Sequence, residues 1–350
     1  MTRGLIKAIK LNNFNIVAEC LSPFVVTLLT IFLHINFILH NRQLLVLLEK
    51  IQKDWEIWSA EPEIEILQQY AIKEKKFQLA YGVSIIGAAS GFMAIPIVHN
   101  ILNLTKSSNI TNSFDPIFTT DYGLNDDDNL FFSCLTAIHS FILTYIVMTI
   151  ILNSDMVFMI CNHHASSIYA AIGYKLSNLD YKRSYCQYEN NNFQKEMDNV
   201  IIFCIKQHKE LLRFLRDIHN CFSLVYLIMV MLNIFIISMT GFATVLNLNQ
   251  PAVAFKFMAA NSGQMLHILF ITVPCEQMSD HSSMISHSVY KSNWYTFPVS
   301  SRRLLLMIMK RSSEPCEFVC GKLYTFSMRN FAMVMKTSIS YITVLCSFQS

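Results

Sequence analysis

The sequence GKLYTFSMRNFAMVMKTSISYITVLCSFQS (residues 321–350) contains the stretch that decides the fold class. From Phe331 onward it is long and apolar enough to cross a bilayer as a helix, because about 20 apolar residues span the hydrocarbon core. The part from Phe331 onward carries one lysine and a series of hydroxyl side chains: Lys336, Thr337, Ser338, Ser340, Thr343 and Ser347. Hydroxyl groups are best tolerated inside a membrane where they face a partner helix or a water-filled cavity. The stretch therefore predicts a membrane helix that faces a pore or a subunit interface.

The composition of the whole chain indicates a membrane protein with several spans. Hydrophobic residues make up 53% of the 350 residues and charged residues only 15%, which is more apolar surface than one soluble core of this size buries. Runs of about 18 or more residues with few or no charges mark six candidate spans: 21–40, 79–102, 130–152, 222–245, 252–274 and 331–348. We therefore expect an all-α, polytopic membrane helical bundle over residues 21–350. The net charge of +3 is too small to indicate a nucleic-acid partner.

Basic residues divide the loops between these spans into two classes. Three loops hold six, eight and six lysines and arginines, respectively: 41–78, 153–221 and 275–325. By contrast, the loop 103–129 holds only Lys106. Because lysine and arginine are retained on the cytoplasmic side during membrane insertion, the three basic loops are expected in the cytoplasm.

Two N-glycosylation sequons agree with this orientation. The tripeptides Asn-Leu-Thr at Asn103 and Asn-Ile-Thr at Asn109 both lie in the loop that is poor in basic residues. Together with the basic residues they predict an extracellular 103–129 loop with glycans on Asn103 and Asn109. The same orientation places the C-terminus outside the cell.

The first twenty residues conflict with this orientation. Arg3, Lys7 and Lys10 favour the cytoplasm, yet six spans with the assigned loops place residues 1–20 outside. One further span upstream would remove the conflict. We therefore interpret residues 1–20 as an extracellular-loop-like N-terminal remnant and expect a seventh span ahead of it.

The cytoplasmic segments 41–78, 153–221 and 275–330 carry helical patterns of their own. In the first segment, apolar side chains recur three or four residues apart on one helix face: Leu44, Leu48, Ile51, Trp55 and Trp58. The third span continues past Asp155 towards Lys175 without a helix breaker, which predicts one long helix that projects into the cytosol. An amphipathic helix is also expected to enter the fourth span directly, and Pro274 is expected to end the fifth. These segments predict an anchor domain continuous with the membrane helices.

Motifs of catalysis and metal binding are missing from the sequence. It contains no Gly-x-Ser-x-Gly, no His-Glu-x-x-His and no phosphate-binding Gly-x-x-x-x-Gly-Lys. His163 and His164 are adjacent, so on a helix they point about 100° apart and do not share a metal easily. We therefore predict no enzymatic activity, no metal site and no cofactor.

Several segments of the chain form a recognisable series in their order and spacing: Asp54-Trp55-Glu56, GYKL at 173–176, GQMLH at 263–267, 290–295, Pro315-Cys316 with 321–323, and KTSISY at 336–341. Taken together, these segments resemble insect odorant receptors of the ant, bee and wasp type. The family has seven membrane helices, a cytoplasmic N-terminus and an extracellular C-terminus. Aligned on these segments, the six candidate spans correspond to the family's second to seventh.

The resemblance implies a function and a set of site residues. It implies a ligand-gated, non-selective cation channel in the plasma membrane of olfactory sensory neurons, a heterotetramer with a shared odorant receptor co-receptor that responds to small volatile or cuticular hydrophobic odorants. The implied ligand positions lie at the outer ends of the first three spans and the fifth: Phe24, Thr27, Leu28, Phe92, Ile95, His99, Ile138, His139 and Met258. The implied pore positions share one face of the last helix or border it: Thr337, Ser340, Val344, Ser347 and Phe348.

Other functions remain open from the sequence. The last span also fits, roughly, the final helix of gustatory receptors, which would make the chain a chemosensory channel of that kind. A truncated receptor product without activity is a second alternative. A G-protein-coupled receptor is opposed by the basic loops and the sequons, because its termini have the opposite orientation.

Overall fold

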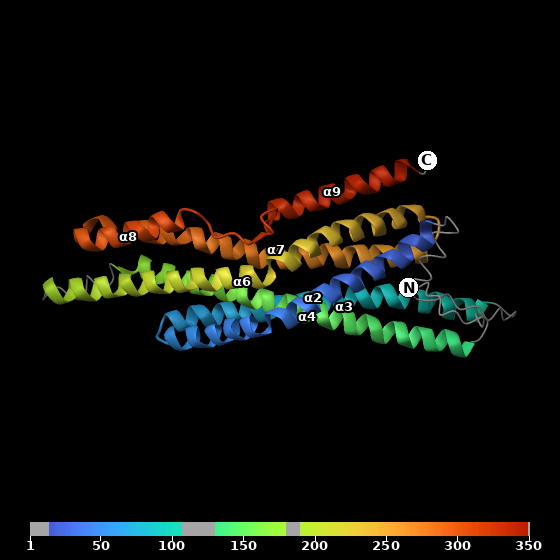
Figure 1. The fold of residues 1–350 in the computed structure, drawn as a ribbon, viewed down its shortest axis with the longest axis horizontal. Helices are drawn as coiled ribbons and strands as arrows, with labels where there is room; N and C mark the ends of the chain where they lie inside the picture. Colours follow the sequence, from blue (N-terminus) through green and yellow to red (C-terminus); the bar gives the residue numbers. More distant parts are fainter. Residues whose placement is uncertain (1–13, 107–129, 180–189, 349–350) are drawn as a thin grey trace.

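A computed structural model describes residues 14–106, 130–179 and 190–348 and shows an elongated bundle of long helices (Figure 1). Its five longest helices are α2 (Phe14–Ile57), α3 (Glu63–Lys106), α4 (Leu130–Ser177), α6 (Asn190–Leu246) and α7 (Pro251–Lys291). They are followed by the 3-10 helix η1 (Trp294–Thr296), α8 (Val299–Ser312), the strands β1 (Val319–Cys320) and β2 (Tyr324–Thr325), and α9 (Met328–Ser347). The predicted all-α helical bundle is confirmed.

Four helices in the described residues are long and apolar enough to cross a membrane. The qualifying segments are Cys20–Ile57, Glu63–Ala94, Cys134–Ser177 and Gln194–Leu246. Two further helices expected to span, α7 and α9, carry more polar side chains and do not qualify by composition alone. Both nevertheless pack along the others, α7 against α3, α4 and α6, and α9 against α6.

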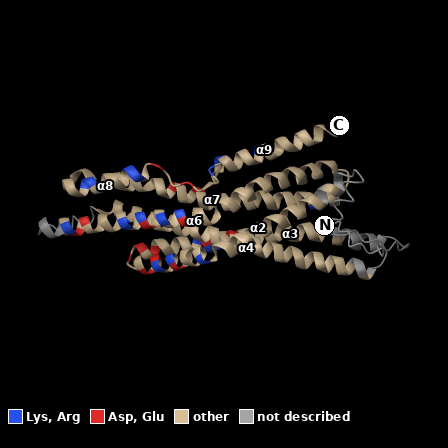
Figure 2. Ribbon diagram, viewed as in Figure 1, with Lys and Arg blue, Asp and Glu red and all other residues tan. Residues whose placement is uncertain are grey.

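Charged residues gather in one half of the bundle. Figure 2 shows lysine, arginine, aspartate and glutamate on α8, on the first half of α6 and around the α2–α3 connection, whereas the opposite half is almost free of them. A charged side chain in the hydrocarbon region costs several kcal/mol, so the uncharged half is the part that fits a bilayer. We call the charged half the anchor; it contains the segments expected in the cytoplasm.

The helices run from one half into the other without a break. The predicted long helices are confirmed in α4 and in α6, each of which joins a candidate span to a cytoplasmic segment. The prediction that Pro274 ends a helix is wrong, because α7 continues through it to Lys291. Membrane helices tolerate an internal proline when packed neighbours hold the chain on both sides, and Ile271 and Cys275 are both fully buried.

The N-terminal segment also differs from its prediction. Helix α2 begins at Phe14, so residues 14–20 form helical turns rather than an extracellular loop. The remaining residues of that segment, 1–13, lie outside the described part of the chain. Helix α2 also has a proline inside it, Pro23.

The two halves of the bundle pack differently, as α4 shows. In the anchor, nearly every side chain from Phe158 to Ile172 is buried. In the uncharged half, Phe131, Ile138 and Ile142 are more than half exposed. The anchor therefore supplies most of the tightly packed core, and the other half presents apolar side chains to lipid or to neighbouring subunits.

A buried acidic residue ties α2 to α4 inside the anchor. The Lys50 ammonium donates to Asp54 at 2.6 Å, and His164 Nε2 lies 3.1 Å from the other Asp54 oxygen. The neighbouring His163 points elsewhere and packs edge-on against Phe77. The two adjacent histidines thus have different partners, and in the described residues no group of three or more His, Cys, Asp and Glu side chains is arranged to hold a metal.

The first anchor helix is rotated slightly from its predicted face. Leu44 and Trp58 are buried as expected, but Leu47 is buried in place of Leu48, which is 40% exposed. A spacing of three or four residues leaves either position compatible with one helix face. Only the packing partners decide between them.

The segment that leads into α9 is fixed on α6. Strands β1 and β2 pair antiparallel, and the turn between them places Gly321 at φ +54°, a left-handed conformation that favours glycine. The Gly321 N–H donates to Ser223 Oγ of α6 at 2.9 Å, and a Cβ at Gly321 would collide with Leu227. The Ser327 side chain then caps the start of α9 by accepting from the Asn330 N–H. The inner end of α9 is therefore held in place.

Helices α3 and α7 are in close contact at Gly263. A Cβ added at Gly263 would lie 2.9 Å from Ala88 Cβ, whereas one added at Gly87 meets nothing within 4 Å. The Gly-Ala-Ala-Ser-Gly stretch of α3 does allow close helix packing, but its contact with α7 is made through Ala88 and Gly91 rather than Gly87.

This geometry predicts opposite outcomes for two matched substitutions. Gly263→Ala forces α3 and α7 apart and should cost about 1–3 kcal/mol, as overpacking does. Gly87→Ala has open space and should leave stability unchanged or slightly raised. Thermal midpoints of the detergent-solubilised variants measure both, and equal midpoints would contradict the close contact.

Candidate functional site

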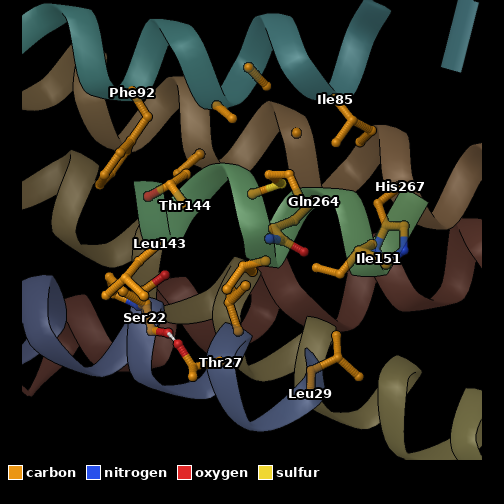
Figure 3. Close-up of a pocket in the computed structure, with 18 of the residues that line it drawn as sticks. Ser22, Thr27, Leu29, Ile85, Phe92, Leu143, Thr144, Ile151, Gln264 and His267 are labelled. Atoms are coloured by element: carbon orange, nitrogen blue, oxygen red, sulfur yellow. Dashed lines mark hydrogen bonds between the residues drawn. The ribbon is translucent and has the colours of Figure 1, made fainter. Parts of the chain in front are cut away.

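A cavity of about 350 Å³ lies in the uncharged half, lined by residues of α2, α3, α4 and α7 (Figure 3). Its wall is mostly aliphatic and aromatic, with side chains that include Val26, Leu29, Ile85, Phe92, Leu143 and Ile151. Small-molecule sites range from about 300 to 1,000 Å³ and are lined mainly by apolar side chains. The cavity therefore fits an apolar molecule at the small end of that range.

Hydroxyl groups in the wall are bonded to their own helices. Thr27 donates to the Pro23 carbonyl at 2.8 Å, and Ser140 donates to the Thr136 carbonyl at 2.8 Å. Thr144 donates to the Ser140 carbonyl at 2.9 Å. Because these donors are engaged, the hydroxyls add little hydrogen-bonding capacity to the cavity.

A buried polar cluster closes the inner end of the cavity. Asp155 of α4 accepts hydrogen bonds from Tyr81 of α3, from Tyr226 of α6 at 2.8 Å, and from His267 Nε2 of α7 at 2.9 Å. The other ring nitrogen of His267 lies 3.4 Å from the Asn233 side-chain amide. All of these side chains are buried, and His267 lines the cavity itself. We call these five residues the Asp155 cluster.

The predicted ligand positions fall into three groups. Thr27, Phe92 and His139 line the cavity. Four others do not line it: Phe24, Leu28, Ile138 and Met258. The side chains of Ile95 and His99 lie outside the described part of the structure.

Five polar lining residues were absent from the predicted ligand set: Ser22, Ser140, Thr144, Gln264 and His267. Gln264 and His267 are three residues apart on α7 and both face the cavity (Figure 3). Their pattern in the sequence could have identified Gln264 and His267 as candidate site residues. A glutamine and a histidine at helical spacing stand out in an otherwise apolar span, because polar side chains inside a membrane segment mark functional positions.

Helix α9 presents the predicted pore positions away from the bundle. Thr337, Ser340, Val344, Ser347 and Phe348 are all exposed. The opposite face holds Val334 and Ser338, both buried, and Ile342, which fills the space over Gly241 of α6. The hydroxyl-rich face is therefore available to a neighbouring subunit or to water.

The predicted glycan positions lie at the edge of the described structure. Asn103 is in the last turns of α3, which ends at Lys106. Asn109 lies outside the described residues. Their use as glycosylation sites stays a prediction.

Together, the fold and the cavity define a polytopic membrane protein with an apolar cavity in the uncharged half of its bundle. A family model described as "7tm Odorant receptor" matches residues 13–339. The chain therefore belongs to the 7tm odorant receptor family, and it is a membrane-spanning insect chemoreceptor.

Relatives among insect proteins agree with this assignment. Odorant receptor 9a of Drosophila melanogaster is 32% identical over 89 residues, which cover 25% of this chain and 22% of the relative. Odorant receptor 10 of Aedes albopictus is 22% identical over 152 residues, which cover 43% of this chain and 40% of the relative. The matched stretches thus span less than half of either relative.

Solved structures share the fold. The insect olfactory receptor OR5 from Machilis hrabei in complex with eugenol superposes with a TM-score of 0.74 at 10% identity, covering 95% of this chain and 82% of that one. A second structure of OR5 from Machilis hrabei superposes with a TM-score of 0.69 at 14% identity, covering 98% of this chain and 84% of that one. At these identities the similarity establishes the fold alone.

The Asp155 cluster leads to a stability prediction. Asp155→Ala leaves two tyrosine hydroxyls and a histidine buried without their acceptor, which should cost about 3 kcal/mol or more. Tyr226→Phe removes one donor and should cost less, about 1–2 kcal/mol.

The matched control is Ser84→Ala on α3, since Ser84 only donates to a carbonyl of its own helix. Thermal midpoints in detergent should be highest for Ser84→Ala, lower for Tyr226→Phe and lowest for Asp155→Ala. An Asp155→Ala midpoint equal to that of the control would show that the cluster contributes nothing to stability.

Proposed function

We propose that this chain is the odorant-binding subunit of a heteromeric, odorant-gated, non-selective cation channel that acts in olfactory signal transduction. The observation that carries the proposal is the partly open apolar cavity among α2, α3, α4 and α7 in the uncharged half of the bundle. Its size and wall suit a small volatile or cuticular hydrophobic odorant. Membership of the odorant receptor family supports the same ligand class.

The ligand contacts in this proposal come from all four helices around the cavity. Thr27 of α2, Phe92 of α3 and His139 of α4 contact the odorant, with Gln264 of α7. The large apolar wall supplies affinity through burial of the ligand surface, at roughly 25 cal/mol per Å². No covalent or redox step is involved.

The ion pathway in this proposal runs along the exposed face of α9. The partner subunits of this chain include the shared co-receptor, and the α9 helices of the resulting tetramer surround the pore. Hydroxyls of Thr337, Ser340 and Ser347 offer oxygen to hydrated ions, whereas Val344 and Phe348 form an apolar constriction that blocks ions by dewetting. The exposure of all five side chains supports this arrangement.

The orientation in this proposal places the anchor in the cytoplasm and the cavity in the outer half of the membrane. The concentration of charge in the anchor supports it. The protein then lies in the plasma membrane of olfactory sensory neurons with an extracellular C-terminus, and Asn103 and Asn109 carry glycans.

A cavity-filling variant tests the ligand site. The chain and an insect co-receptor are expressed together in cells, and currents are recorded against a panel of odorants. Ala89 lines the cavity, so Ala89→Phe should raise the half-maximal odorant concentration at least about tenfold, since overpacking costs about 1–3 kcal/mol.

The control is Val83→Phe on the same helix, where the side chain is 64% exposed. It should leave the response unchanged. Equal responses from both variants at equal surface expression would contradict the site, and no current from the parent chain would favour the inactive-product alternative.

Cysteine accessibility tests the pore. Ser347→Cys should react with a water-soluble, charged thiol reagent applied from outside and change the current, because Ser347 is exposed on α9. Ser338→Cys, on the buried face of the same helix, should be protected. Reaction rates are compared with the parent chain, which has its own Cys346; protection of both introduced thiols would show that this face of α9 does not line the conduction path.

A further inference from the structure

The cavity contains a side-chain amide that the apolar wall does not satisfy. Gln264 extends into the cavity from α7, near the middle of the lining (Figure 3). Its amide has no hydrogen-bond partner among the described residues, although it carries both a donor and an acceptor. An amide in apolar surroundings gains from any ligand that offers the complementary group.

Most other polar groups of the wall are already engaged. Thr27, Ser140 and Thr144 donate to carbonyls of their own helices. Both ring nitrogens of His267 have neighbours, Asp155 on one side and Asn233 on the other. His267 therefore acts as a fixed part of the Asp155 cluster, whereas Gln264, one turn away on α7, can turn to a ligand. Ser22 also lines the cavity, at the end away from His267 (Figure 3).

The ligand chemistry follows from what the wall contains and what it excludes. Among the described lining residues there is no lysine, arginine, aspartate or glutamate, so the cavity has no partner for a charged group. A neutral hydroxyl or carbonyl oxygen matches the amide. The cavity around it is lined by carbon, with Phe92 and Leu143 at the end away from His267 (Figure 3).

We propose that Gln264 selects odorants that carry one neutral oxygen function on an apolar body, and that the oxygen lies near the middle of the cavity, at the Gln264 amide. This inference rests on the proposed odorant site and adds a chemical class and a specificity-determining residue to it. Alcohols, aldehydes, ketones and esters fall in the class, and hydrocarbons and ionised acids or amines do not. Sites that hydrogen-bond a ligand group discriminate strongly against analogues that lack it.

The test uses straight-chain alcohols from hexanol to dodecanol, the corresponding 2-ketones and the n-alkanes. The parent chain should respond to the best oxygenated compound at a concentration at least about tenfold below that of the alkane of equal length. Gln264→Met, which keeps the length of the side chain, should remove most of this difference. Gln264→Glu keeps a hydrogen-bonding group and should retain the preference for oxygenated compounds, because a carboxyl group accepts from alcohols and, when protonated, donates to ketones.

Ser22→Ala is the matched control, because Ser22 is another polar lining residue and lies at the end of the cavity away from His267 (Figure 3). It should leave the preference unchanged. A Gln264→Met chain with normal surface expression and the full preference for oxygenated compounds would overturn the inference. So would a preference that is lost in Ser22→Ala instead.

Thermal stabilisation of the detergent-solubilised chain by the same compounds separates this inference from the channel proposal. If alcohols stabilise the parent chain but not Gln264→Met, the inference stands even when no current is recorded, and only the channel proposal fails. If currents are recorded but neither the currents nor the thermal shifts distinguish the parent from Gln264→Met, the channel proposal stands and the role of Gln264 is rejected.

Discussion

The bundle depends on one buried carboxyl group, that of Asp155. A carboxyl in the interior is tolerated only where hydrogen-bond donors surround it, and Asp155 of α4 receives donors from α3, α6 and α7. The donors can reach its two oxygens only if all four helices stay in register. The cluster therefore fixes the point at which the helices come together.

The cavity is a consequence of that fixed point. On the anchor side of the cluster, α4 is almost wholly buried, and the packing is dense. On the other side α2 and α4 diverge towards the far end of the bundle (Figure 1). Residues of α2, α3, α4 and α7 line the cavity on this side, with His267 at its inner end. In the proposed channel, the anchor holds the subunit rigid while the looser half binds the ligand and α9, fixed at its inner end by the β1–β2 hairpin, faces the pore.

The fold class could be predicted from the sequence because apolar runs and charged loops act over whole helices. The continuous helices α4 and α6 also followed from the lack of breakers. The prediction that Pro274 ends a helix was wrong, because proline's effect on a helix depends on the packing of its neighbours, which the sequence does not give. For the same reason the spacing of Leu44 and Leu48 defined a helix face only to within one position.

The cavity residues were harder to predict than the helices. Three of the nine predicted ligand positions line the cavity, since the rotation of each helix about its axis is set by contacts such as Gly263 with Ala88 that no local pattern reveals. Gln264 and His267 were visible as part of the GQMLH segment that resembles odorant receptors, but the hydrogen bond of His267 is with Asp155, more than one hundred residues earlier in the chain. The segments that carried the resemblance thus include polar contacts of the anchor and of the cluster: Asp54 with His164, Lys175 with Glu63, and His267 with Asp155.

The proposed binding of small apolar molecules between α2, α3, α4 and α7, directly outside the Asp155 cluster, can be tested by photo-crosslinking. A straight-chain alcohol that carries an alkyl diazirine is used, and the adducts are mapped by mass spectrometry. This binding site predicts adducts on cavity-lining residues such as Val26, Leu143 and Met148 that an excess of the unlabelled alcohol suppresses. Adducts confined to outward-facing residues such as Ile38 and Ile142, and unaffected by competitor, would contradict it.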